Sequence, residues 1–176
     1  MIEKVKSRGE GIILIGFMGA GKTTLGRALA TQWGYPFEDL DDVIEAKEGK
    51  TIPEIFAQRG EAGFRAAETA ALEALKVDTQ QPMVLAAGGG TPCFGDNITL
   101  LKALGQVIYL KLSPQILTQR LAPQKANRPL IASLDDTELL TFIQQLLAKR
   151  SPYYEQADII LENPSLSDLL DSLKNP

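Results

Sequence analysis

Short apolar runs alternate along this chain with longer segments of helical periodicity. The first run, Ile12-Ile13-Leu14-Ile15, contains no polar residue and is typical of a strand buried on both faces of a parallel sheet. Four more short runs follow, each separated from the one before by at least one segment with a helical pattern. The predicted strands are residues 11–15, 36–39, 83–87, 106–112 and 158–161.

Helical patterns fill most of the chain between these strands. Gly34, Gly49 and Gly60 each stand where a pattern stops, and glycine commonly ends a helix in the left-handed conformation. Thr51 is placed to cap the third helix. The predicted helices are residues 22–33, 41–48, 53–59, 61–77, 97–104, 114–121, 135–150 and 166–173, and residues 122–133 are predicted as a loop. This alternation predicts an α/β fold with a parallel sheet covered on both faces, whose ligands bind at the carboxyl ends of the strands.

Composition narrows the class of protein. A chain of 176 residues with 44% hydrophobic content is long enough for one well-packed domain. Because 22 acidic residues outnumber 18 basic ones, no broad basic face is expected and nucleic acid is not a predicted partner. The single cysteine, Cys93, cannot form an internal disulfide and fits the cytoplasm. No apolar run approaches the length of a membrane span, and residues 1–10 lack a signal-peptide core, so no membrane partner is expected.

Residues 16–23, GFMGAGKT, match the pattern G-x-x-x-x-G-K-[ST] directly after the first predicted strand. Glycines let successive backbone N–H groups converge on a polyphosphate. Lys22 can then reach the β- and γ-phosphates, and the Thr23 hydroxyl can ligate Mg²⁺. The alternative, a glycine-rich turn that only joins a strand to a helix, is disfavoured because the motif stands between a predicted strand and a predicted helix. The motif therefore predicts a nucleoside triphosphate site.

Carboxylates follow the second predicted strand in the run Asp39-Leu40-Asp41-Asp42. In an extended segment, residues two apart share a face, so Asp39 and Asp41 are expected to point together toward the phosphate loop. One can hold the water shell of Mg²⁺ while the other accepts a proton from an attacking hydroxyl. The chain has no histidine, which leaves proton chemistry to carboxylates. The alternative is an acidic cluster that caps the following helix.

Two further features fall where a phosphoryl acceptor would bind. Residues 88–90 are three glycines after the third predicted strand, and they offer either a backbone surface for a small substrate or a flexible turn. Arg65 and Glu68 are three apart and therefore adjacent on one helix face. They form either a solvated ion pair or an arginine that a glutamate directs toward a carboxylate ligand.

Taken in order, these features resemble the shikimate kinase family, over about residues 10–163. Several motifs in the same order make the resemblance specific. The matching segments are residues 16–23, Asp39-x-Asp41 with Ile44-Glu45, Ile55-Phe56 with Gly60-Glu61, Phe64-Arg65 with Glu68, Gly88-Gly89-Gly90, Arg128-Pro129-Leu130, and Arg150-x-x-Tyr153-Tyr154.

The resemblance implies a three-layer α/β/α P-loop fold with a central five-stranded parallel sheet. It implies one kinase domain over residues 1–176, with a substrate-binding segment at about 38–68 and a lid at about 121–133. The implied reaction is transfer of the γ-phosphoryl group of ATP, with Mg²⁺, to the 3-hydroxyl of shikimate, which gives shikimate 3-phosphate and ADP in the chorismate pathway of aromatic amino-acid biosynthesis. The implied state is a cytoplasmic monomer that binds ATP and shikimate.

The resemblance also implies roles for individual residues. Asp41 is the favoured base, Lys22 and Arg128 are the other catalytic groups, and Arg128 arrives on the lid. The implied ATP-binding residues, with Arg120 stacked on adenine, are Gly19, Ala20, Gly21, Lys22, Thr23, Thr24, Arg120 and Arg128. The implied shikimate-binding residues, with Arg65 and Arg150 on the carboxylate, are Asp41, Phe56, Phe64, Arg65, Gly88, Gly89, Gly90 and Arg150. Mg²⁺ would be held by Thr23 and, through water, by Asp39.

Some alternatives stay open on sequence alone. Phe56 and Phe64 can be ordinary core residues instead of pocket walls. A related kinase that acts on gluconate or a nucleoside monophosphate is the nearest other enzyme, and a catalytically silent regulator that binds shikimate or a nucleotide is the alternative from another class. Retention of Lys22, Asp41 and Arg128 argues against the silent protein.

Overall fold

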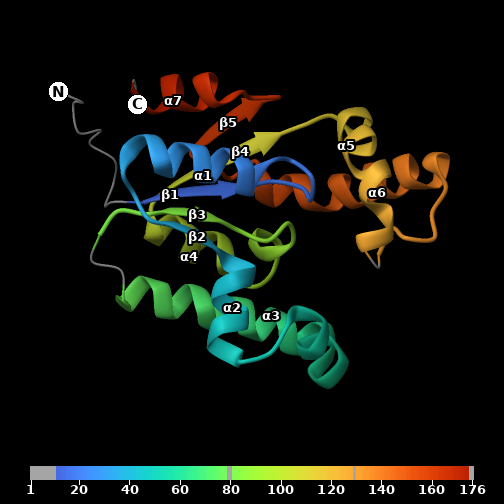
Figure 1. Cartoon of the computed structure of the whole chain (residues 1–176), viewed down its shortest axis with the longest axis horizontal. Coiled ribbons are helices and arrows are strands. Elements are labelled where there is room, and N and C mark those ends of the chain that lie inside the picture. The colour runs from blue at the N-terminus through green and yellow to red at the C-terminus, as the bar shows by residue number, and fades with distance from the viewer. Residues whose placement is uncertain (1–10, 79–80, 129, 175–176) are drawn as a thin grey trace.

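The centre of the molecule is one sheet of five parallel strands, in the order β2-β3-β1-β4-β5 (Figure 1). The structure is a computed structural model that describes residues 11–78, 81–128 and 130–174. Pro129 and the polar residues 1–10 lie outside the described residues. The strands are β1 (Ile12–Ile15), β2 (Phe37–Asp39), β3 (Val84–Ala86), β4 (Gln106–Lys111) and β5 (Ile159–Glu162). The predicted parallel sheet is confirmed, and each strand end lies within one residue of its predicted position.

Helices cover both faces of this sheet, and every side chain of β1 and β3 is buried. In β1, Ile13 and Ile15 pack into one core with α2, α3 and α4, whereas Ile12 and Leu14 pack into the other with α1, α5 and α7. The helix α6 contributes Ile143 to the second core and Tyr154 to the first. The helices are α1 (Lys22–Trp33), α2 (Leu40–Glu48), α3 (Ile52–Asp78), α4 (Asn97–Leu104), α5 (Pro114–Leu121), α6 (Asp136–Tyr154) and α7 (Leu166–Lys174).

The predicted break at Gly60 is present inside α3. Gly60 has φ 66° and ψ −170°, a conformation that side-chain-bearing residues avoid, and it separates the two predicted helical segments. At the start of α3, Thr51 caps the helix as predicted: its hydroxyl accepts from the Glu54 N–H, and the Glu54 carboxylate accepts from the Thr51 N–H at 2.7 Å. The first turns of α3 are therefore a separately capped unit that bends away from the rest of the helix.

Residues 122–133 are only partly the loop that the sequence predicts. A 3₁₀ helix, η2 (Ala122–Asn127), continues directly from α5, and Ile131 is fully buried in the core beneath it. The Lys125 ammonium fixes this segment to the start of α6, because it donates to the Leu134 carbonyl at 2.9 Å and forms an ion pair with Asp136 at 3.0 Å. The prediction missed the 3₁₀ helix, whose Lys125 is held by residues that follow the segment.

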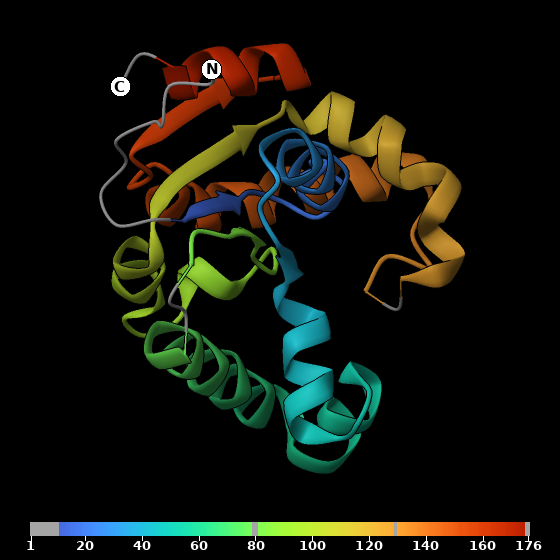
Figure 2. The same ribbon diagram turned by 60° about the vertical axis from the view of Figure 1, so that its left-hand side comes forward.

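The carboxyl ends of β1, β2 and β3 meet at one edge of the sheet, as parallel pairing requires. Asp39, the last residue of β2, is in register with Ala86, and Ala86 is in register with Leu14. The phosphate loop, the acidic run and the triple glycine therefore leave the sheet side by side. In Figure 2, α2 descends from this edge on one side, while α5 and the start of α6 extend from it on the other.

Candidate active site

The phosphate loop begins where β1 ends and closes at the start of α1. Gly19 and Gly21 have φ 78° and 93°, so a side chain at either position would be strained. Gly21 is the N-cap of α1. Because glycine has no side chain that could cap the helix, the N–H groups of the first turn stay available to a phosphate. The Lys22 ammonium donates to the carbonyls of Gly16 at 2.8 Å and Phe17 at 2.9 Å. Burial lowers the pKa of Lys22 to about 8, against the opposing charges of Asp39 and Asp41.

A cavity of about 650 Å³ opens over this loop. It is walled by the loop itself, the end of β2, the end of β3 and the segment from α5 to Arg128. The lining residues are Met18, Gly19, Gly21, Lys22, Thr23, Thr24, Asp39, Asp41, Ala87, Gly88, Gln119, Arg120, Pro123, Gln124 and Arg128. The three predicted catalytic residues, Lys22, Asp41 and Arg128, thus surround one space, with most of the predicted ATP-binding residues.

Asp39 connects the nucleotide side of this cavity, at Thr23, with the acceptor side, at Asp41. One of its carboxylate oxygens accepts from the Thr23 hydroxyl at 2.9 Å, and the other accepts from the Asp41 N–H at 3.1 Å. The capping alternative therefore holds for Asp39, which is the N-cap of α2, and it coexists with a place in the cavity. The expected extended geometry is wrong, because Asp41 lies in the first turn of α2. Both carboxylates still line the cavity.

The environment of Asp41 favours a carboxyl group that exchanges protons near neutral pH. Removal from water by the surrounding protein is the main cause that raises the pKa of Asp41 to about 6, and the carboxylates of Asp39 and Glu68 add to the effect. The ammonium of Lys22 opposes it. A carboxylate with such a pKa is suited to general-base chemistry.

The triple glycine brings the acceptor side close to these groups. A Cβ atom built on Gly88 would lie 3.7 Å from the Asp41 carboxylate, and one on Gly89 would lie 3.4 Å from the Arg150 guanidinium. A Cβ atom on Gly90 would lie 2.8 Å from both terminal nitrogens of Arg65. The three glycines therefore let the backbone pass close to an acid and two arginines, and a Cβ atom on Gly90 would collide with Arg65.

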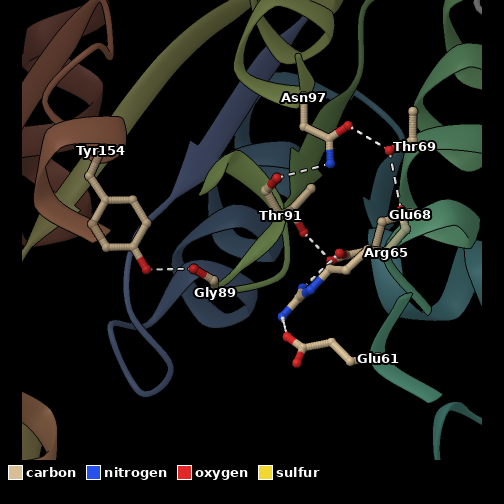
Figure 3. A network of polar contacts seen from close by, with 8 residues as sticks. All are labelled: Glu61, Arg65, Glu68, Thr69, Gly89, Thr91, Asn97 and Tyr154. Carbon is tan, nitrogen blue, oxygen red and sulfur yellow. Dashed lines mark hydrogen bonds and ion pairs between the residues drawn. The ribbon is translucent and has the colours of Figure 1, made fainter. Parts of the chain in front are cut away.

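Arg65 is held in place by carboxylates (Figure 3). Its guanidinium bonds Glu68 at 2.7 Å and reaches Glu61 at 3.4 Å. Glu68 is 1% exposed and accepts a second hydrogen bond from the Thr91 hydroxyl. A buried glutamate that accepts two hydrogen bonds is not part of a solvated surface ion pair. The structure therefore supports the second interpretation of the sequence, in which Glu68 positions Arg65.

The comparisons with known proteins show the family to which this chain belongs. The family model for shikimate kinase matches residues 18–171. The chain belongs to the shikimate kinase family. The shikimate kinase of Bacteroides thetaiotaomicron is 44% identical over 157 residues, which cover 89% of each chain.

Solved structures of shikimate kinases are also similar over nearly the whole chain. The crystal structure of the B. thetaiotaomicron enzyme superposes with a TM-score of 0.83 at 40% identity and covers 94% of each chain. A shikimate kinase from Acinetobacter baumannii in complex with shikimate gives a TM-score of 0.78 at 39% identity, covering 93% of this chain and 89% of that one. A gluconokinase from Sinorhizobium meliloti, at 19% identity and a TM-score of 0.56, shares the fold.

Other predicted site residues of this shikimate kinase family member differ in burial and position. Phe64 is 7% exposed and belongs to the core, whereas Phe56 is 39% exposed and its ring centre lies 4.7 Å from that of Phe64. Arg120 lies against the phosphate loop, where its guanidinium is 3.4 Å from the carbonyls of Gly19 and Ala20. Arg128 faces the cavity. The roles of these residues toward ligands stay predictions.

Sequence reasoning gave no role to several residues that contact the predicted site. The ring of Phe94 lies 3.9 Å from the Arg65 guanidinium carbon and stacks against it. Asn97, itself buried, donates to the Thr91 carbonyl at 3.0 Å and accepts from the Thr69 hydroxyl at 2.8 Å. The only sequence signal was the polar Thr91 directly after the glycines.

The helices of the described ranges include none that is both long enough and apolar enough to cross a membrane.

Proposed function

We propose that this protein transfers the γ-phosphoryl group of ATP to the 3-hydroxyl of shikimate, giving shikimate 3-phosphate and ADP in the chorismate pathway. The observation that carries the proposal is the convergence of Lys22, Asp41 and Arg128 on one cavity. Beside it, the triple glycine borders Arg65 and Arg150. Membership of the shikimate kinase family supports the choice of acceptor.

The acceptor would bind beside the triple glycine. Arg65 and Arg150 supply two guanidinium groups for its carboxylate, and a planar guanidinium matches a carboxylate better than a lysine does. The backbone of residues 88–90 would meet the ring hydroxyls. Phe56, with Phe64 behind it, would cover the apolar side of the ring. This arrangement would direct the 3-hydroxyl toward Asp41.

Chemistry then requires a base and charge neutralisation. Asp41 would accept the proton of the 3-hydroxyl as the new bond from oxygen to the γ-phosphorus forms and the bond from that phosphorus to the β–γ bridging oxygen breaks. Lys22 and Arg128 would neutralise the negative charge that develops on the phosphoryl oxygens and on departing ADP. Because such transfer depends mainly on positioning and electrostatics, these groups suffice without a covalent intermediate.

The residues present also fit Mg²⁺. No cluster of three or more acidic, cysteine or histidine side chains that could hold a metal by itself occurs within the residues that the structure describes. The Thr23 hydroxyl and the Asp39 carboxylate lie together and offer the oxygen ligands that Mg²⁺ prefers, Asp39 through water. When bound, Mg²⁺ would neutralise part of the negative charge of the phosphates during transfer.

The proposal extends to the remaining ATP contacts and to the state of the protein. Arg120 would contact the adenine, and the backbone of residues 19–24 would hold the phosphates. We treat residues 1–176 as one kinase domain with a substrate-binding segment at about 38–68 and a lid at about 121–133. We also retain the expectation of a cytoplasmic monomer, which sedimentation analysis and cell fractionation would test.

A direct test measures ATP consumption with a panel of acceptors: shikimate, quinate, gluconate and nucleoside monophosphates. We expect turnover with shikimate well above that with every other acceptor, and a product phosphorylated at the 3-hydroxyl by phosphorus NMR. Equal or greater turnover with gluconate would transfer the assignment to the nearest other kinase. Binding of shikimate without any turnover would favour the silent regulator.

A further inference from the structure

Each carbonyl group of the triple glycine accepts a hydrogen bond from within the protein. The Gly88 carbonyl accepts from the Thr91 N–H at 3.2 Å, and the Gly90 carbonyl accepts from the Cys93 N–H at 2.9 Å. These two bonds belong to the turn η1 (Thr91–Cys93) that the loop itself forms. The Gly89 carbonyl accepts from the Tyr154 hydroxyl, on α6, 65 positions along the chain (Figure 3).

The amides of the same loop are left for a ligand. Among the hydrogen bonds between described residues, neither the Gly89 nor the Gly90 N–H acts as a donor. The peptide bonds of the described chain are all trans, so the N–H of Gly90 points opposite to the carbonyl of Gly89. Holding that carbonyl on the protein side therefore turns the Gly90 N–H toward the other side of the loop.

This middle peptide is the part of the loop that needs an outside anchor. It has glycine on both sides, and glycine crosses between conformations that other residues cannot reach. A rotation of the peptide plane would replace the N–H with a carbonyl, which cannot donate a hydrogen bond to a ring hydroxyl of the acceptor. The two flanking carbonyls are fixed by the turn, but the Gly89 carbonyl depends on Tyr154.

The surroundings of Tyr154 hold its ring in place and keep its hydroxyl protonated, so that it can donate a hydrogen bond. Its side chain is fully buried, and its ring centre packs 5.0 Å from that of Tyr109. Burial raises the pKa of Tyr154 far above its ordinary value, so the hydroxyl keeps its proton. It lies one helical turn after Arg150, on the same face of α6.

The Arg150 guanidinium lies close to Gly89. A Cβ atom on Gly89 would be 3.4 Å from the Arg150 guanidinium and 3.2 Å from the Met18 N–H of the phosphate loop. The Arg150 guanidinium lies 5.6 Å from the ring centre of Phe17 in that loop. One turn of α6 thus places an arginine beside the glycine loop and a hydroxyl behind it.

We propose that Tyr154 is a positioning residue for the acceptor, whose hydroxyl fixes the orientation of the Gly89–Gly90 peptide so that its N–H and the Arg150 guanidinium face the acceptor together. The inference rests on the proposed function for its kinetic readout. Because Tyr154 is fully buried, it would not touch the acceptor, and its hydroxyl would act through the Gly89 carbonyl to which it donates.

The test replaces Tyr154 with Phe, which keeps the ring and removes the hydroxyl. We expect the KM for shikimate to rise roughly tenfold, the scale of losing one buried hydrogen bond, while kcat falls by less than about threefold and the KM for ATP stays within about twofold. The matched control is Tyr109→Phe, which removes the other hydroxyl of the same ring pair. Its shikimate KM should stay within about twofold of wild type.

Each other outcome is decisive. A shikimate KM in Tyr154→Phe that equals that of Tyr109→Phe would overturn the proposal. So would a parallel loss of ATP affinity or a failure to fold while Tyr109→Phe folds, because either would assign the hydroxyl to stability alone. A wild-type protein that does not phosphorylate shikimate would overturn the proposed function itself, whereas active wild-type and control proteins with an unaltered Tyr154→Phe would overturn only the role of Tyr154.

Discussion

Asp41 is the single residue on which proton transfer depends in the proposed reaction. Replacing it with Asn keeps the size and the position in the first turn of α2 but removes the base. We expect turnover to fall by at least about a hundredfold, the lower range for the loss of a general base, while ATP binding changes little. Steady-state kinetics and calorimetric titration with ATP measure the two effects. Turnover within a few-fold of wild type would leave Asp41 as only a member of a capped helix turn.

The shifted pKa values of Asp41 and Lys22 predict how activity depends on pH. Asp41 must be ionised to accept a proton, and since its pKa is raised to about 6, kcat/KM should fall as the pH drops through that value. Lys22 must be charged to bind phosphate, and since its pKa is lowered to about 8, kcat/KM should also fall as the pH rises through that value. The profile of kcat/KM for ATP should therefore be bell-shaped.

The profile of kcat provides the control for this assignment. Bound phosphates favour the charged form of Lys22, so the alkaline limb should move to higher pH in kcat than in kcat/KM. The acid limb should disappear from the residual activity of Asp41→Asn. A kcat/KM that is constant from about pH 5 to about pH 9 would contradict both shifted values.

At the scale of elements, Gly26 sets how closely α1 approaches the sheet. A Cβ atom there would lie 2.7 Å from a ring carbon of Phe37 in β2 and 3.2 Å from Leu14 in β1. Alanine normally stabilises a helix relative to glycine by about 1 kcal/mol, but here we expect Gly26→Ala to lower the free energy of unfolding by about 1–3 kcal/mol through overpacking. Urea unfolding measures the change.

The matched control on α1 is Gln32→Ala, at an exposed position. It should leave the free energy of unfolding within about 0.5 kcal/mol of wild type. If Gly26→Ala were instead more stable than wild type, Phe37 would have moved at no cost and the close packing of α1 on β2 would not constrain the sequence.

The elements themselves were largely predictable because their signals are local. The apolar run of β1, the break at Gly60 and the phosphate loop are each contained in a few consecutive residues. The end of α6 was not predictable in this way: the helix passes Pro152 and ends at Tyr154, although proline usually marks an end. Pro152 is close enough to the helix terminus that only one turn is affected.

Contacts between distant parts of the chain could not be derived from those local signals. Phe94 stacks on Arg65 and Tyr154 bonds Gly89 only because the fold brings them together. The pairing of Asp39 with Asp41 was predicted, but from an extended geometry that α2 does not have. Sequence thus identifies which residue types carry the chemistry, and three-dimensional packing decides how each is held.

At the scale of the whole molecule, the segment after α5 faces the acceptor side across the cavity and carries Arg128. We expect this lid to close when ATP and acceptor are both bound, which would exclude competing water from the phosphoryl group. Arg128→Ala should therefore lower kcat far more than it weakens binding of either substrate, because its contact forms mainly in the closed state.

Hydrogen exchange across residues 122–128 and 130–133 measures the closure. Protection should increase when both ligands are added and change little with shikimate alone. A matched control is Lys125→Ala, which removes the contacts to Leu134 and Asp136 but no cavity-lining charge, and which should alter exchange in the absence of ligand. Equal protection under all conditions, with a fully active Arg128→Ala, would describe a fixed surface segment.

The two hydrogen bonds of Asp39 should couple the free energy of nucleotide binding to that of acceptor binding. The Asp39 carboxylate accepts from the Thr23 hydroxyl on the nucleotide side and from the Asp41 N–H on the acceptor side. A ligand that strengthens or weakens one of these hydrogen bonds should therefore change the free energy of the other. We expect a favourable coupling free energy between Mg·ATP and shikimate, of about 1–2 kcal/mol. Linkage then demands that the factor by which Mg·ATP tightens shikimate binding equal the factor by which shikimate tightens Mg·ATP binding. Calorimetric titrations with a non-hydrolysable ATP analogue, in both orders, would measure the factor, and Asp39→Asn should bring it toward one.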